Sequence, residues 1–149
     1  MSEAEYRLYS FTNMYLSSIQ KGIQTAHVVS EMSAIWCEDP PSLDAKEVFD
    51  VWADQDKTVI VLNGGNQANL EYIFQCAEKF ATEYELPVVR FYEDQESLGG
   101  ALTAVGIILS KQIYNLAAEM RKLQTELVTG LSDNTKMFVN VLNQCGLAN

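Results

Sequence analysis

The chain has 149 residues, a formal net charge of −10 at pH 7, and three cysteines without a CxxC pair. Its length suits one domain with one core, and its acidity disfavours an extended duplex-binding surface, although a small local pocket could still take one end of a nucleic acid. The cysteines indicate neither a disulfide framework nor a thiolate metal site, and no run reaches the roughly 18 apolar residues of a membrane span. We therefore expect a cytoplasmic protein without a membrane partner.

The first predicted elements are a strand and a long helix. Residues 6–13 alternate apolar or aromatic side chains with polar ones, which is typical of a strand. Ser17 or Ser18 can cap a helix over 19–36, whose apolar residues fall on two sides and predict two buried faces. A shorter helix over 42–54 is expected to form a lid or bracket on the core.

The middle of the chain predicts the rest of a sheet. Residues 57–63 form a continuous apolar run with β-branched side chains, which predicts a central strand covered on both faces. Asn66 can cap an amphipathic helix whose apolar positions run over 70–84, and further strands are expected over 88–92 and 102–109. This order predicts an α/β fold with a four-stranded mixed sheet and helices on both faces.

Two more helices are expected at the C-terminal end of the chain. Apolar residues over 113–127 step by three and four along a narrow seam, and Ser132 can cap a final helix. We divide the chain into an α/β domain over 1–109 and a helical extension over 110–149 packed on the same domain. Packing on the chain's own sheet is one interpretation of the seam, and a homo-oligomer joined through 113–127 is the other.

Candidate functional residues lie on the first helix and in one loop. His27 is the single histidine, so a His-rich metal site is excluded. At about 100° per residue, Gln20, Gln24, His27 and Glu31 share one polar stripe. The stripe either faces solvent or lines a cleft, where the amides would hold a substrate carbonyl and the imidazole would transfer a proton. The carboxylate-rich loop 93–100 either is a solvated hairpin or contributes to a site at the strand ends.

Four stretches of the chain resemble one family in order and spacing. LSSIQKGIQTAH (Leu16 to His27) matches a first-helix motif at Gln24 and His27, and GGALTAVGI (Gly99 to Ile107) is similar to a final PGSxTVLGI. Between them stand Trp52, the VIVL strand, Leu70, Ala77 and Leu86-Pro87. Over about residues 8 to 109, the chain resembles the type II peptidyl-tRNA hydrolases, as a divergent member with a phage origin among the options.

The resemblance implies a four-stranded mixed sheet and hydrolysis of the ester between a peptide and tRNA, with no metal and no cofactor. By this resemblance the catalytic candidates are His27, Lys21 and Asp94, and the substrate-binding candidates are Gln20, Gln24, Asn63 and Thr103.

The chain departs from the family pattern at several of these positions. The family's paired lysines are replaced by Ser18 and Gln20, with Lys21 displaced by one position, and its lysine after the second strand is replaced by Asn63. The family's D-A-G-x-T loop has no direct match in this chain, and Asp94 lies near the aligned positions but out of register with them.

Two hypotheses about function follow. In the first, the chain is a divergent ester hydrolase that releases an acyl or peptidyl group from tRNA or from a smaller acyl ester. In the second, it is a catalytically inactive binding module of the same fold that sequesters a nucleotide, a peptide or a protein partner, as a viral accessory protein would. An unrelated α/β domain is the remaining alternative.

Overall fold

Four strands form one mixed sheet in the computed structural model, which describes residues 5–94, 100–123 and 130–148. The strand order is β2-β1-β4-β3. The parallel pair is β1 with β2, whereas β4 runs antiparallel to both β1 and β3. The bounds are Tyr6–Thr12 for β1, Thr58–Asn63 for β2, Val88–Tyr92 for β3 and Leu102–Ser110 for β4. This confirms the predicted α/β fold with a four-stranded mixed sheet.

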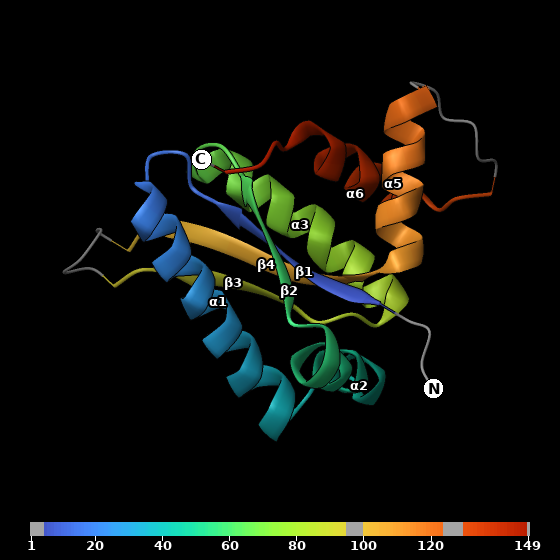
Figure 1. Ribbon diagram of the computed structural model, residues 1–149, viewed down its shortest axis with the longest axis horizontal. Helices are drawn as coiled ribbons and strands as arrows, with labels where there is room; N and C mark the ends of the chain where they lie inside the picture. The colour runs from blue at the N-terminus through green and yellow to red at the C-terminus, as the bar shows by residue number, and fades with distance from the viewer. Residues whose placement is uncertain (1–4, 95–99, 124–129, 149) are drawn as a thin grey trace.

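Helices cover both faces of this sheet (Figure 1). On one face, α1 and α2 pack on a core that includes Leu8 and Ile108, and on the other, α3 and α6 pack on a core that includes Phe11 and Val105. The bounds are Ser18–Glu38 for α1, Leu43–Val51 for α2, Gln67–Tyr84 for α3, Lys111–Leu123 for α5 and Asp133–Gln144 for α6. A π-helical turn, η1 (Trp52–Asp56), follows α2.

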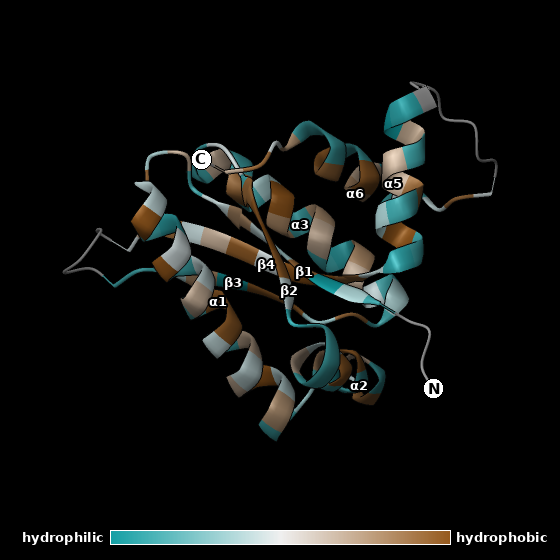
Figure 2. Ribbon diagram, in the orientation of Figure 1, coloured by the Kyte–Doolittle hydropathy of each residue, from teal (hydrophilic) through white to brown (hydrophobic). Residues whose placement is uncertain are grey.

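The prediction of a central strand over 57–63 was wrong, because β2 lies at an edge of the sheet and β1 and β4 are central. Figure 2 shows hydrophobic colours along most of β2, yet Val59 is 38% exposed. The C-terminal segment covers part of its outer edge, where the Asn63 amide donates to the Gly146 carbonyl and the Ala148 amide donates to the Val61 carbonyl. The apolar run therefore belongs to an edge strand, of which the C-terminal segment covers only a part.

The expectation of two buried faces on α1 was also wrong. Its buried residues follow one stripe that faces the sheet, whereas Ile19 is 78% and Ile23 49% exposed. The stripe consists of Lys21, Gln24, Thr25, Val28, Met32 and Trp36. Because half of the residues in this stripe are polar, the pattern of apolar residues alone predicted the wrong buried side for the first turns of the helix.

The C-terminal helices pack on the α3 side of the molecule. Tyr114 and Ala117 of α5 are buried in the same core as Phe138 of α6, and Met120 packs against that core. This part of the predicted 113–127 seam therefore contacts the chain's own core. The Leu123 side chain and Leu127 lie outside the described residues. In the described part of the chain, no helix is long and apolar enough to cross a membrane.

Candidate functional site

Buried polar side chains gather where α1 meets the sheet. Eight polar side chains are buried in the described part of the chain, and seven of them come from α1, β4, and β1 with the residue after it. They are Ser10, Thr12, Asn13, Lys21, Gln24, Thr25 and Thr103. Burying a polar group costs free energy unless it is hydrogen-bonded, so this cluster calls for an account of its partners.

The start of α1 is fixed by a capping box. The Ser17 hydroxyl accepts a hydrogen bond from the Gln20 backbone N–H at 3.2 Å, and the Ser17 backbone N–H donates to the Gln20 side-chain oxygen at 2.9 Å. These two bonds satisfy N-terminal amide groups that would otherwise lack a partner in the helix. Gln20 is exposed and is engaged in the cap, so the structure places it outside the buried cluster.

Gln24 lies at the centre of the cluster and joins α1 to two strands. Its Nε2 donates to Glu93 Oε2 at 2.8 Å, just beyond β3, and its Oε1 accepts from the Thr103 hydroxyl of β4 at 2.7 Å. The residue is 4% exposed. Both ends of the amide are therefore fixed, and the second N–H of Nε2 has no partner among the described residues.

Thr103 faces α1 because β4 carries a bulge at this residue. In the β3–β4 register, Phe91 pairs with Ala104 and Tyr92 with Leu102, so Thr103 is the extra residue. An extra residue breaks the alternation of a strand and re-aims a side chain. Ala104 belongs to the α1-side core, and the Thr103 hydroxyl also reaches the α1 side, where it meets Gln24.

Lys21 lies one turn before Gln24 and is only 8% exposed. The Thr25 hydroxyl donates to the Lys21 carbonyl at 2.8 Å, and it lies 2.9 Å from the Ser10 hydroxyl of β1. Because Thr25 has a single hydroxyl proton, Ser10 is the donor in the second bond. Within the described residues, the Lys21 ammonium forms neither an ion pair nor a hydrogen bond with another side chain.

His27 lies at the exposed edge of the same stripe. Its ring stacks on Phe91 of β3, with ring centroids 4.6 Å apart and planes 4° from parallel. The Phe91 carbonyl in turn lies 3.3 Å from the Thr103 hydroxyl. The imidazole therefore stands beside the Gln24 and Thr103 pair, although it makes no hydrogen bond to another described residue.

Two of the sequence-predicted site residues have other surroundings. Asp94 is exposed next to Glu93, and it is Glu93 whose carboxylate reaches α1. Asn63 lines a hollow of about 300 Å³ beside α3 and α6, where its side-chain oxygen accepts from the Gly65 amide at 2.9 Å. The structure thus places Lys21, Gln24 and Thr103 in the buried cluster with His27 at its exposed edge. It leaves Gln20, Asp94 and Asn63 outside the cluster.

Sequence reasoning missed four members of the cluster, and it also missed Glu93 as the partner of Gln24. The four are Ser10, Thr12, Asn13 and Thr25. Ser10 carried a usable signal, because it lies two residues after Leu8 and therefore on the same face of β1. A polar side chain buried on that face needs a hydrogen-bond partner. In the described part of the chain, no group of three or more His, Cys, Asp or Glu side chains could hold a metal ion. Comparison with protein-family models finds no match, and comparison with curated proteins finds none either.

Proposed function

We propose that the chain hydrolyses a carboxylic ester, either the ester that joins an acyl or peptidyl group to tRNA or a smaller acyl ester. The observation that carries the proposal is the setting of Lys21. Lys21 is only 8% exposed, lies one helical turn before the fixed Gln24 amide on α1, and has no counter-ion among the described residues. The only imidazole of the protein, His27, lies one turn beyond Gln24 on the same helix.

Each group has a chemical task in such a reaction. His27 takes a proton from water as the water oxygen attacks the ester carbonyl carbon, and returns it to the alcohol oxygen as the C–O bond breaks. The Lys21 ammonium and the remaining N–H of Gln24 donate to the negative oxygen that develops on the carbonyl. Glu93 and Thr103 hold the Gln24 amide in place, so that its donor does not have to reorganise.

The resemblance to type II peptidyl-tRNA hydrolases supports the same assignment. Gln24, His27 and Thr103 occupy positions that match the family motifs, and the lysine displaced to Lys21 is buried whereas Gln20 is exposed. The displacement by one position therefore turns the lysine toward the sheet.

A binding module without turnover is the second candidate, and one observation favours it. A general base is ordinarily oriented by a hydrogen bond to a third group, but the His27 imidazole stacks on Phe91 and has no hydrogen-bond partner in the described part of the chain. On this alternative, the same donors hold a carbonyl or an anion of a nucleotide, peptide or protein partner. The acidic net charge of −10 also disfavours a large tRNA surface.

The test is release of the amino acid from N-acetyl-aminoacyl-tRNA and from a small acyl ester. Lys21→Met and His27→Ala should each lower turnover by about 10²-fold or more, because each removes a group that acts in the transition state. Lys79→Met removes an exposed lysine from α3, on the far side of the sheet, and is the matched control. Thermal melting checks that all three variants fold.

The outcomes separate the two candidates. Turnover that persists in both Lys21→Met and His27→Ala would refute the assignment of the site. Saturable binding of N-acetyl-aminoacyl-tRNA without turnover in the unmodified protein, lost in Lys21→Met and kept in Lys79→Met, would establish the binding module instead.

A further inference from the structure

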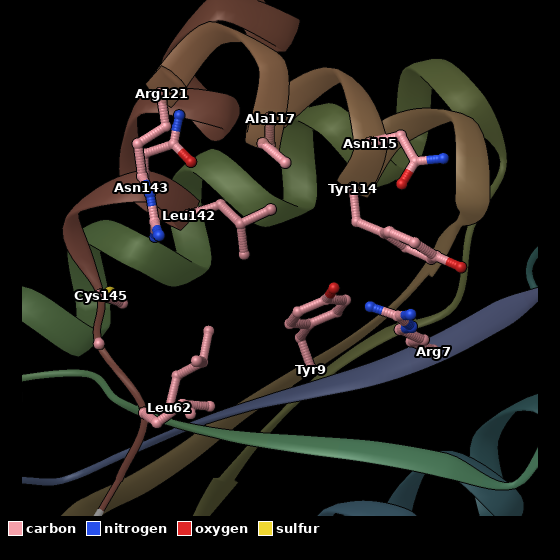
Figure 3. A pocket seen from close by; sticks show the side chains of 13 residues that line it. Arg7, Tyr9, Leu62, Tyr114, Asn115, Ala117, Arg121, Leu142, Asn143 and Cys145 are labelled. Atoms are coloured by element: carbon pink, nitrogen blue, oxygen red, sulfur yellow. The ribbon is translucent and has the colours of Figure 1, made fainter. Parts of the chain in front are cut away.

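A second hollow lies on the opposite face of the sheet, and we propose that it binds a small organic anion: a phosphate or carboxylate carried on an apolar or aromatic body. The cleft has a volume of about 320 Å³ and is lined by β1, α5, α6 and the C-terminal segment (Figure 3). Pockets for small ligands begin at roughly this size, which suits a body of one or two rings.

The charges that line the cleft are of one sign. Arg7 comes from β1 and Arg121 from the last turn of α5, and no Asp or Glu is among the described residues that line it. The chain as a whole has 20 acidic and 10 basic side chains, so this lining runs against the mean field of the molecule. Neither arginine forms an ion pair with another described residue. Unpaired guanidinium groups in a hollow are suited to carboxylate or phosphate oxygens.

Arg7 is held in a fixed orientation. Its guanidinium carbon lies 3.9 Å from the centre of the Tyr114 ring, and Tyr114 is itself buried. Figure 3 shows the guanidinium nitrogens beside the Tyr9 hydroxyl. Burial raises the pKa of Tyr9, and the Arg7 guanidinium opposes this shift, so the phenol is neutral at physiological pH and carries a proton that it can donate. Arg7 and Tyr9 can therefore both donate to one anionic group.

The rest of the cleft is apolar or neutral. Leu62, Ala117 and Leu142 line it together with the Tyr9 ring, and Asn115 and Asn143 add neutral hydrogen-bonding groups. The C-terminal segment forms one wall, where Leu147 pairs with Leu62 across the edge of β2. An anion with an apolar body matches both parts of this lining, whereas a bare ion would leave the apolar part without a partner.

This cleft is independent of the proposed ester hydrolysis. Tyr9 and Ser10 are neighbours on β1 and point to opposite faces, Tyr9 toward α5 and Ser10 toward α1. A failure of either proposal therefore leaves the other untouched.

The experiment is a titration followed by amide chemical shifts, with phenyl phosphate and benzoate as anionic probes and benzyl alcohol as the neutral one. At least one anion should give saturable shifts at Tyr9, Leu142 and Gly146, and benzyl alcohol should bind at least about tenfold more weakly. Whichever anion binds more tightly identifies the headgroup.

Variants test whether the two arginines are responsible. Arg7→Gln and Arg121→Gln should each weaken the anion at least about tenfold. Arg90→Gln is the matched control, because Arg90 also lies over an aromatic ring, at 4.5 Å from the centre of Phe74, but does not line this cleft. The proposal is overturned if neither anion gives saturable shifts, if benzyl alcohol binds as tightly, or if Arg121→Gln binds like Arg90→Gln. Because Arg121 is exposed on α5, its variant keeps the test valid even if Arg7→Gln does not fold.

Discussion

Gly106 sets the distance between β4 and α1, and replacing it should measure how tightly the helix is held. A Cβ atom at Gly106 would overlap Cγ1 of Val28, which is completely buried, while the nearest atom of another residue, Val89 Cγ2, would stand at an ordinary 3.7 Å. Overpacking of this kind costs about 1–3 kcal/mol. Gly106→Ala should therefore lower the free energy of unfolding by that amount.

The opposite sign would be expected if the helix were free to move away. Gly106 does not have a positive φ, so its backbone conformation suits alanine. Without the overlap, Gly→Ala would stabilise the protein by about 0.4–1 kcal/mol, because it reduces the entropy of the unfolded chain. The sign of the change thus reports directly on the contact with Val28.

A double-mutant cycle isolates this contact. Val28→Ala alone should cost roughly 2 kcal/mol, at about 0.8 kcal/mol for each buried methyl-sized group plus a cavity term. In the double variant the new methyl group enters the vacated space, so the total cost should be at least about 1 kcal/mol less than the sum. Urea denaturation of the single and double variants gives all the values.

Gly22→Ala is the matched control, since a Cβ there meets nothing within 4 Å and the residue is an exposed position of α1. It should stabilise the protein by about 0.5–1 kcal/mol. Additivity of Gly106→Ala and Val28→Ala within about 0.5 kcal/mol, or a stabilising Gly106→Ala, would refute the close approach of β4 to α1.

Three further predictions concern single side chains. Thr103→Val leaves the Gln24 oxygen without its donor and should cost about 1–3 kcal/mol in urea denaturation, whereas Thr103→Ser should not. Burial raises the pKa of Tyr9 above its usual 10, so the stabilisation from the neutral phenol is complete below pH 10 and is lost as pH rises further. Tyr9→Phe should therefore make the melting temperature fall less steeply above pH 10. An equally steep fall in the variant would contradict this prediction. Burial also raises the pKa of the Cys145 thiol, so maleimide should label the exposed Cys37 before it labels Cys145. Peptide mapping measures both labelling rates, and equal rates for the two thiols would contradict this prediction.

The elements of the sheet could be predicted from the sequence, but their neighbours could not. Residues 57–63 and 102–109 both read as continuous apolar runs, yet only the second is buried along its whole length. The difference arises because β4 has a strand on each side, whereas β2 has only β1 and a short stretch of the C-terminal segment. Strand order depends on contacts far apart in the chain, and local periodicity contains no record of them.

The candidate site was predictable in part for the same reason. Helical spacing placed Gln24 and His27 in one stripe, and the structure puts both beside β3. The stripe's other members, Gln20 and Glu31, are exposed. Thr103 entered the prediction through the family resemblance, but its meeting with Gln24 depends on a bulge. Because β4 is buried on both faces, its sequence has no apolar–polar alternation that a bulge could visibly break.

The buried polar cluster on the α1 face lowers the stability of the fold, because its polar groups lose their contact with water. Apolar packing in the same volume would avoid the desolvation of Lys21 and Gln24, so stability alone does not account for them. Gly106 and Val28 hold α1 against β4 one turn beyond Gln24, which fixes the Gln24 amide at 2.7 Å from the Thr103 hydroxyl. A helix pressed this closely onto a strand keeps the polar groups of Gln24 and Thr103 bonded to each other. Under the proposed function, it also keeps the Lys21 ammonium, which has no counter-ion among the described residues, in place for the ester carbonyl.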